Sequence, residues 1–112
     1  MKIKIKFRLE DIELDFFNYS DGNIGIMMNH IDTGQSWGNV TVNVENLRLP
    51  HNEVLIKNWH SNKGIYEALL EQEIIMSKRR DCLVGINKAI VCSLHPVILA
   101  KLNDSKKTST FL

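Results

Sequence analysis

The residues of this sequence best suited to metal binding or nucleophilic catalysis are two cysteines and four histidines. They are Cys82, Cys92, His30, His51, His60 and His95. Cys92 and His95 have the spacing of a zinc ligand pair, and a hairpin that placed Cys82 across from Cys92 would add a third ligand. A structural zinc site has four ligands, usually in two tight pairs. We therefore predict no metal and no cofactor, with Cys92 in the core and His95 capping a surface helix.

Other enzymatic arrangements are equally incomplete. Neither cysteine lies in a loop with a neighbouring cation or a glycine-rich turn, although a cysteine–histidine pair distant in sequence stays open. The clustered carboxylates are Glu10, Asp11, Glu13 and Asp15. They share their segment with lysines, which favours ion pairing over general acid catalysis. Gly34 and Gly38 lack the lysine and the strand-to-helix context of a phosphate loop. We expect that the protein is not an enzyme.

Two tryptophans and a group of cations are the side chains best suited to contact a partner. Trp37 begins an expected strand, and Trp59 precedes an expected helix. Aromatic residues at such edges either close the core or anchor an interface. The triplet at 78–80 is interpreted first as the charged exit of that helix, and alternatively as a phosphate-binding cluster. The candidate partner-binding residues are Trp37, Lys57, Trp59, Lys78, Arg79 and Arg80.

Composition narrows the class of protein. A chain of 112 residues with 44% hydrophobic and 24% charged residues is typical of one globular domain. The net charge of +1 gives no overall attraction to nucleic acid or to an acidic membrane. The basic start alternates with isoleucines instead of leading into an apolar run, and no window has the ~18 apolar residues of a membrane helix. We expect a cytoplasmic protein with reduced thiols and no membrane contact.

The first two strands are the clearest elements. Residues 2–9 and 12–16 alternate between charged and apolar side chains, as half-buried strands do. We expect a tight turn at Glu10-Asp11, which gives the opposed pairs Arg8–Glu13, Lys6–Asp15, Leu9–Ile12, Phe7–Leu14 and Ile5–Phe16. Only Lys2 and Lys4 then remain unpaired. This favours a solvated sheet face with its own counter-charges over a nucleic-acid stripe.

The remaining elements follow from changes in hydrophobic period and from turn residues. We expect strands over 24–31, 37–44 and 53–59, a helix over 64–76 capped by Ser61 or Asn62, a hairpin around 85–88, and a helix from Pro96 to about Leu102. The predicted fold class is α+β, with a mainly antiparallel β-sheet of about five to seven strands, one amphipathic helix packed on it and a short C-terminal helix. One domain over 1–102 and a flexible tail over 103–112 are expected.

Several scattered motifs resemble those of a known family. They are Tyr19-x-x-Gly22, Gly34, Thr41-Val42-Asn43-Val44, Ile56-Lys57-x-Trp59-x-x-Asn62-x-Gly64, Leu69, Ile74-Ile75 and Val91-Cys92-x-Leu94. Over roughly residues 12–100 the chain resembles an uncharacterised bacterial domain family carried on plasmids, conjugative elements and phages. The resemblance implies an α+β fold and a mobile-element setting, and it brings no catalytic residues. Ser61 departs from the acidic residue expected there, and Asn43 is expected to bond a neighbouring loop.

Three function classes remain. The first is a non-enzymatic module that binds a host protein or ribonucleoprotein complex and inhibits a defence system such as a CRISPR nuclease, in the manner of an anti-CRISPR protein. The second is a nucleic-acid-binding accessory protein for plasmid or conjugative-element maintenance, with direct nucleic-acid contact through the lysine row. The third, a small enzyme, has only unplaced histidines and cysteines in its support. A homodimer is also open, because a second copy could cover an edge strand.

Overall fold

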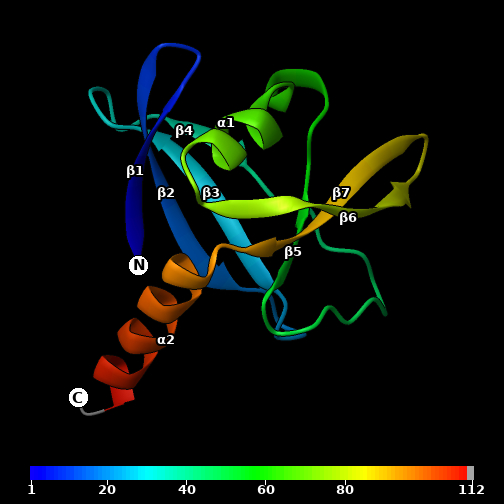
Figure 1. Cartoon of the computed structure of the whole chain (residues 1–112). Helices are drawn as coiled ribbons and strands as arrows, with labels where there is room; N and C mark the ends of the chain where they lie inside the picture. The colour runs from blue at the N-terminus through cyan, green and yellow to red at the C-terminus, as the bar shows by residue number, and fades with distance from the viewer. Residues whose placement is uncertain (111–112) are drawn as a thin grey trace.

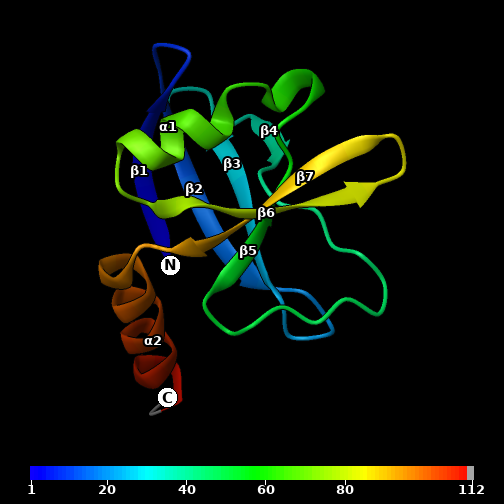
Figure 2. The same cartoon turned by 45° about the vertical axis from the view of Figure 1, so that its right-hand side comes forward.

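The computed structural model describes the backbone of residues 1–110 and the side chains of residues 1–105. Its elements are β1 (Lys2–Phe7), β2 (Glu10–Asn18), β3 (Ile24–His30), β4 (Ser36–Asn39), β5 (Glu53–Ile56), a 3₁₀ turn (His60–Asn62), α1 (Ile65–Glu71), β6 (Ile75–Val84), β7 (Asn87–Leu94) and α2 (Pro96–Thr110). The α+β class is confirmed. The strands form two antiparallel sheets, of order β1-β2-β3-β4 and β5-β7-β6, which cross in space beneath α1 (Figures 1 and 2).

The first hairpin has the predicted faces, but its turn and register are wrong. The turn is at Arg8-Leu9, not Glu10-Asp11, and both residues have positive φ (52° and 64°) as in a type I′ turn. The observed pairs are Lys2↔Asp15, Ile3↔Leu14, Lys4↔Glu13, Ile5↔Ile12, Lys6↔Asp11 and Phe7↔Glu10. The displacement is an even number of residues, so the apolar side chains within the two strands keep their side of the sheet, whereas Leu9 lies in the turn and is exposed.

The two sheets join through the segment after β4. This segment was expected to continue one strand from Trp37 to Val44, but β4 ends at Asn39. The N–H of Val40 donates to the carbonyl of Ile26 in β3 (2.8 Å), while the carbonyl of Val40 accepts from Lys57 just after β5 (2.8 Å). Thr41 then forms an isolated bridge with Ile56. Two residues therefore carry the hydrogen bonding from one sheet into the other.

Helix α1 is shorter than the 64–76 expected. Glu73 takes a left-handed conformation (φ 59°), and the N–H groups of Glu73 and Ile74 donate to the carbonyls of Leu70 and Leu69. This is the Schellman arrangement that ends helices. The prediction of a cap from Ser61 or Asn62 is also wrong. Gly64 (φ 94°) occupies the cap position, and Asn58 Oδ1 accepts the Tyr66 N–H (3.1 Å).

The chain beyond α1 corrects two further expectations. Ile75 begins the ten-residue strand β6, so the triplet at 78–80 lies on a strand and not at a helix exit. The C-terminal helix starts at Pro96 as predicted, with His95 Nδ1 accepting the Val97 N–H (3.2 Å), but α2 runs to Thr110. The tail predicted over 103–112 is therefore helical through residue 110, and residues 111–112 lie outside the described part of the chain.

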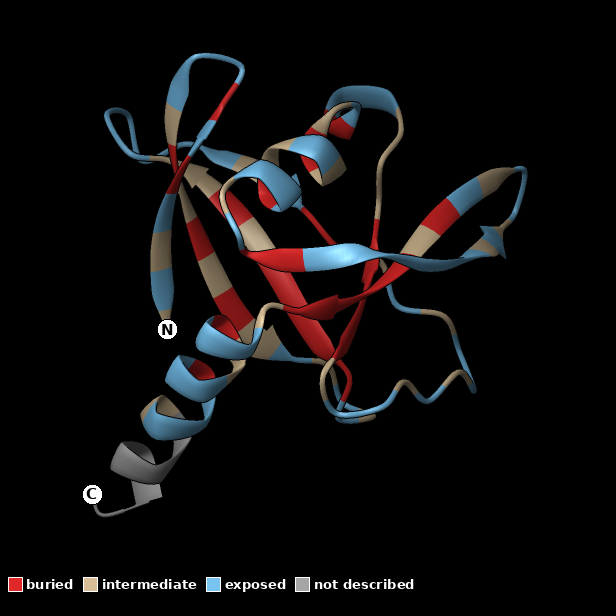
Figure 3. Cartoon of the chain, viewed as in Figure 1, coloured by how far each residue is buried: buried red, intermediate tan, exposed pale blue. Residues whose placement is uncertain are grey.

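The main hydrophobic core lies between the two sheets and beneath both helices. Its members with 0% exposure include Ile12, Leu14, Ile26, Val40, Val54, Ile56, Ile65, Leu69 and Cys92. Both sheets and α1 contribute to it, and α2 adds Ile98 and Leu102. Buried stretches accordingly face inward along β2, β3, β5 and β7, while the outer part of the β6–β7 hairpin is largely exposed (Figure 3).

Candidate partner-binding surface

The three-stranded sheet has a second, outward face with its own small apolar cluster. Along β7, Cys92 packs into the main core, whereas Ala89 and Val91 point away from it and join Leu55 of β5. Partly buried residues around these three are Val42, Val44, Leu47, Leu49, Trp59, Cys82 and Val84. We call this surface, together with the exposed length of β6, the outer face. It is where the sheet meets solvent and the 42–49 segment.

The structure brings four of the six predicted partner-binding residues to the outer face. Trp59 packs against its apolar cluster, and the Lys57 ammonium lies 6.0 Å from the centre of the Trp59 ring. Arg80 pairs across the ladder with Val91, which places its side chain on the same face. Arg79 reaches back over the sheet, where its Nε lies 3.2 Å from an oxygen of Glu53. An aromatic side chain and three cations thus share one surface.

Lys78, near the start of β6, is engaged in contacts within the fold. Its backbone N–H donates to Tyr66 Oη (2.8 Å), and its ammonium lies 3.3 Å from Asp81 on the same strand. It pairs with Cys92, whose side chain belongs to the main core. Bulges on both sides of Lys78 bend the strand there. Lys78 therefore fixes the start of the exposed segment. Unlike Arg79 and Arg80, it lies opposite a residue of the main core and is not placed on the outer face.

Trp37 lies apart from this surface. It belongs to β4 in the other sheet, packs against the main core and stacks on the ring of His30 with centroids 5.3 Å apart. Of the two interpretations open for Trp37, the core boundary describes this environment and the shared interface does not. The sequence has no marker that separates the two tryptophans, because each lies at an element boundary and only the sheet assignment distinguishes them.

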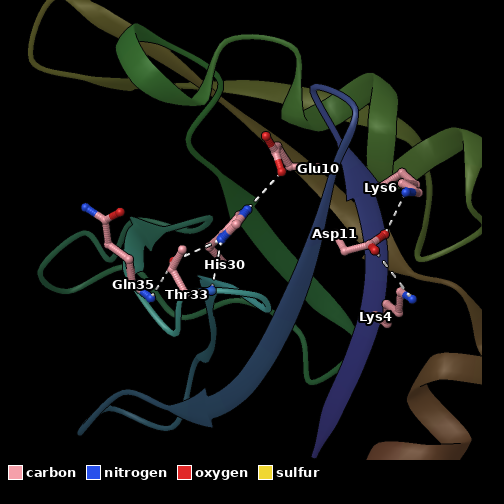
Figure 4. A network of polar contacts seen from close by, with 7 residues as sticks. All are labelled: Lys4, Lys6, Glu10, Asp11, His30, Thr33 and Gln35. Atoms are coloured by element: carbon pink, nitrogen blue, oxygen red, sulfur yellow. Dashed lines mark hydrogen bonds and ion pairs between the residues drawn. The ribbon is translucent and has the colours of Figure 1, made fainter.

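A polar network around His30 was not predicted (Figure 4). The Nδ1 atom of His30 accepts a hydrogen bond from the backbone N–H of Thr33 and lies 2.9 Å from the Oγ1 atom of Thr33. On the other side of the ring, His30 Nε2 lies 2.9 Å from Glu10 Oε2. A carboxylate, an imidazole and a hydroxyl in this order resemble a nucleophilic triad. Its only signal in the sequence was the i, i+3 spacing of His30 and Thr33 in a turn.

The two backbone N–H groups that follow Thr33 are both engaged within the turn. The N–H of Gly34 donates to the His30 carbonyl (2.8 Å), and the N–H of Gln35 donates to Thr33 Oγ1 (3.2 Å). An acyl-transfer site needs free donors near its nucleophile. The arrangement therefore holds the β3–β4 turn against the start of β2, beneath the stacked Trp37.

The lysine row of β1 carries its counter-charges, although not those predicted. Lys6 Nζ lies 2.8 Å from one oxygen of Asp11, and Lys4 Nζ lies 3.7 Å from the other (Figure 4). Lys2, expected to be unpaired, lies 3.6 Å from Glu13. The hydrogen bond from Lys6 lowers the pKa of the Asp11 carboxyl, and the same contact raises the pKa of Lys6. A row that is neutralised in this way is a poor stripe for phosphates.

A groove of about 710 Å³ lies between the β1–β2 turn and α1. It is lined by Lys6, Phe7, Arg8, Leu9, Lys63, Gly64, Glu67, Ala68, Glu71 and Gln72. Arg8 crosses its mouth, where it stacks over Phe7 (4.8 Å) and donates to the carbonyl of Lys63 (2.9 Å). Three cations and two carboxylates line it, so the groove has no dominant charge with which to select a ligand.

The cysteines are not arranged as the ligand set considered above. Cys82 lies opposite Ala89, whereas Cys92 lies opposite Lys78, so the hairpin does not pair the two thiols. Burial, with a smaller contribution from Glu53, raises the pKa of Cys92 to about 12. Across the residues that the structure describes, no group of three or more His, Cys, Asp or Glu side chains is placed to hold a metal ion.

Comparisons with known proteins return no relative. No family model, no curated protein and no solved structure matches this chain. The family resemblance therefore stays a prediction. Within the described part of the chain, no helix is both long enough and apolar enough to cross a membrane.

Proposed function

We propose that this protein is a non-catalytic protein-binding module of a phage or another mobile element, and that it inhibits a host defence enzyme such as a CRISPR nuclease. The mobile-element setting rests on the sequence resemblance. The binding surface rests on the outer face, which carries Trp59 with Lys57 beside it and the two arginines Arg79 and Arg80. Tryptophan and arginine are the residue types most often found as anchors of protein interfaces.

The single observation that supports this proposal most strongly is the exposure of Arg79 and Arg80 on the β6–β7 hairpin. The cations at 78–80 are all exposed, and the hairpin extends away from the two packed sheets (Figures 1 and 3). A rigid two-stranded projection presents side chains at low conformational cost, because the ladder already fixes its backbone. Such a shape suits insertion into a cleft of a larger enzyme.

The test is capture of a host protein by the tagged chain, followed by a functional assay. We expect one stable partner from host lysate, and protection of phage or plasmid DNA from CRISPR cleavage when the chain is expressed. The variants Trp59→Ala and Arg80→Ala should each weaken capture at least tenfold, as truncation of an anchor does. Lys101→Ala, an exposed cation on α2, is the matched control and should leave capture unchanged. Absence of both partner and protection would contradict the proposal.

Nucleic-acid binding in element maintenance is the alternative, and one observation favours it. Among the described side chains, Arg80 and Lys88 have no carboxylate within ion-pair distance, and both lie on the β6–β7 hairpin. Binding through these cations should weaken steeply as salt rises. A filter-binding assay at low salt separates the two functions. Retention of DNA or RNA that is lost in Arg80→Gln would support the alternative, and no retention would exclude it.

A further inference from the structure

The free edge of the three-stranded sheet is the strand β6. Its hairpin with β7 turns through Gly85-Ile86, and the positive φ of Gly85 (63°) at the first turn position is typical of a type II′ turn. Residues that flank such a turn exchange both backbone hydrogen bonds, and bonded residues then alternate along the strand. Val84, Cys82 and Arg80 therefore bond to β7. Asp81 and Leu83, which lie between them, direct their N–H and C=O groups outward.

The other sheet shows how an edge is closed in this protein. β1 is also an edge strand, and the N–H and C=O groups of Lys6 point outward from it. The side-chain amide of Gln72 binds both, accepting from the N–H (2.7 Å) and donating to the carbonyl (2.8 Å). A side chain thus takes the place of a neighbouring strand. At the root of β6, Tyr66 Oη likewise accepts the Lys78 N–H.

Beyond Lys78 the edge of β6 is open. Within the described residues, no hydrogen bond reaches the outward N–H groups of Asp81 and Leu83 from elsewhere in the fold. The Leu83 side chain is 70% exposed, and Ile86 at the turn is 98% exposed. An unpaired strand edge with exposed apolar side chains is a template for another strand.

The charges on β6 decide which kind of strand it can receive. The segment 78–84 carries three cations and one carboxylate, a net charge of +2, and the edge keeps a charge of +1 when Glu53 beside Arg79 is counted. A second copy would bring the same positive charge, which opposes pairing of β6 with itself. Arg79 and Arg80 lie on the outer face, whereas Leu83 lies on the opposite side of the strand. An incoming strand with acidic side chains on one face and apolar side chains on the other matches the arginines on the outer face and Leu83 on the opposite face.

We propose that the β6 edge between Arg79 and Leu83 binds an extended acidic segment of a partner protein as an added strand. This inference rests on the proposed function and specifies its mode of binding. The main chain of the segment pairs with Asp81 and Leu83, its acidic side chains meet the two arginines, and its apolar side chains meet Leu83. Backbone pairing of this kind supplies affinity, and the alternating side chains supply specificity.

The probe is an acetylated and amidated eight-residue peptide of alternating Glu and Val, titrated up to about 1 mM into the ¹⁵N-labelled full chain. We expect the largest NMR shifts at the amides of Asp81 and Leu83. Arg79→Gln with Arg80→Gln should weaken binding about tenfold and flatten its salt dependence. Leu83→Pro removes an outward N–H without touching the β7 ladder, and it should also weaken binding about tenfold. Leu83→Ala keeps that N–H and isolates the loss of the side chain.

The remaining outcomes each overturn the inference. If an alternating Lys-Val peptide binds equally well, the positive charge of β6 does not select the partner. If the NMR shifts are confined to Trp59, the peptide does not bind at the β6 edge. Dimerisation of the free chain that is lost in Leu83→Pro would make a second copy the occupant. Displacement of the peptide by an oligonucleotide of equal charge would assign the edge to nucleic acid. No binding at 1 mM, alongside host-partner capture that depends on Trp59, would overturn strand addition alone and leave the proposed function standing.

Discussion

Asp11 is the residue on which the basic row of β1 depends. One carboxylate serves both Lys4 and Lys6, one on each oxygen. The hydrogen bond from Lys6 is the largest influence that lowers the pKa of Asp11. The side chains of Lys6 and Asp11 are 66% and 27% exposed, so solvent screens the pair and its contribution to stability is small.

The first prediction concerns the pH dependence of this pair. A lowered carboxyl pKa stabilises the fold above the unfolded value of about 4, and the contribution is lost as pH falls through the lowered value. Asp11→Asn should therefore be less stable than wild type at neutral pH, and the gap should close in acid. Asp15→Asn is the control, since Asp15 lies on the same strand without an ion pair among the described side chains. Urea unfolding from pH 7 to 2 measures the gap, and a constant gap would contradict the assignment.

The second prediction separates the two thiols. Burial raises the pKa of Cys92 to about 12, so at pH 8 its thiolate fraction is on the order of one in ten thousand. Cys82 is partly exposed. Iodoacetamide at pH 8 should add one alkyl group to the folded chain, at Cys82, and two groups in denaturant. Peptide mass mapping checks the site, and rapid alkylation of Cys92 in the folded chain would count against its burial.

Charge pairing illustrates what the residue types alone could predict. When the apolar side chains of β1 and β2 share one face, the cations of β1 and the carboxylates of β2 must meet on the other, in any register that differs by an even number of residues. The identity of each pair depends on the turn. Arg8 and Leu9 give no turn signal, because neither is glycine or asparagine, and so the pairs were predicted four residues out of register. The His30–Glu10 contact was missed because it joins the first residue of β2 to the last residue of β3, and local sequence does not give the register of these two strands.

At the scale of elements, the β1–β2 turn holds two side chains in a conformation that suits glycine. Arg8 gains from it, because it stacks on Phe7 and bonds the Lys63 carbonyl. Leu9 is 96% exposed and has φ of 64°. Its conformation costs roughly 1–2 kcal/mol relative to glycine. Leu9 is thus strained with nothing in the described structure to offset it.

The third prediction follows from this strain. Leu9→Gly should raise the free energy of unfolding by about 0.5–1 kcal/mol, because relief of the strain exceeds the added entropy of an unfolded glycine. Leu9→Ala keeps a Cβ and serves as the control, with no gain expected. Urea unfolding of both variants measures the difference. Equal stability of the two would indicate that the turn is not strained at Leu9.

The second hairpin shows where element prediction failed. Ile74, Ile75 and Met76 extend the apolar pattern of α1, and the cations at 78–80 suit a helix end, so the sequence favoured a helix to residue 76. The Schellman turn falls on Glu73, where glycine would have given the usual signal. The strand β6 is then fixed by pairing with β7, a tertiary contact that local sequence does not encode. Four of the six candidate binding residues lie on one face, and this common face could not be predicted without the strand β6.

At the scale of the whole molecule, stability depends on how two small sheets are joined. Thr41 lies at this junction and is 1% exposed. Its Oγ1 accepts the Ile26 N–H of β3 (3.0 Å) and lies 2.9 Å from Tyr19 Oη, while its backbone bridges to Ile56 of β5. Asn62, buried before α1, donates to the carbonyl of Asn39 at the end of β4 (2.6 Å). Polar groups, and not apolar packing alone, therefore fix the angle between the sheets.

The last prediction tests the junction through Thr41→Val. Valine keeps the shape of threonine but leaves the Ile26 N–H buried without an acceptor, which should lower the free energy of unfolding by about 1–3 kcal/mol. Thr41→Ser keeps the hydroxyl and loses only a methyl group. Amide exchange separates the two causes, because the Ile26 amide should exchange faster in the valine variant and remain protected in the serine variant. A valine variant as stable as wild type, with Ile26 still protected, would mean that apolar packing alone holds the sheets together.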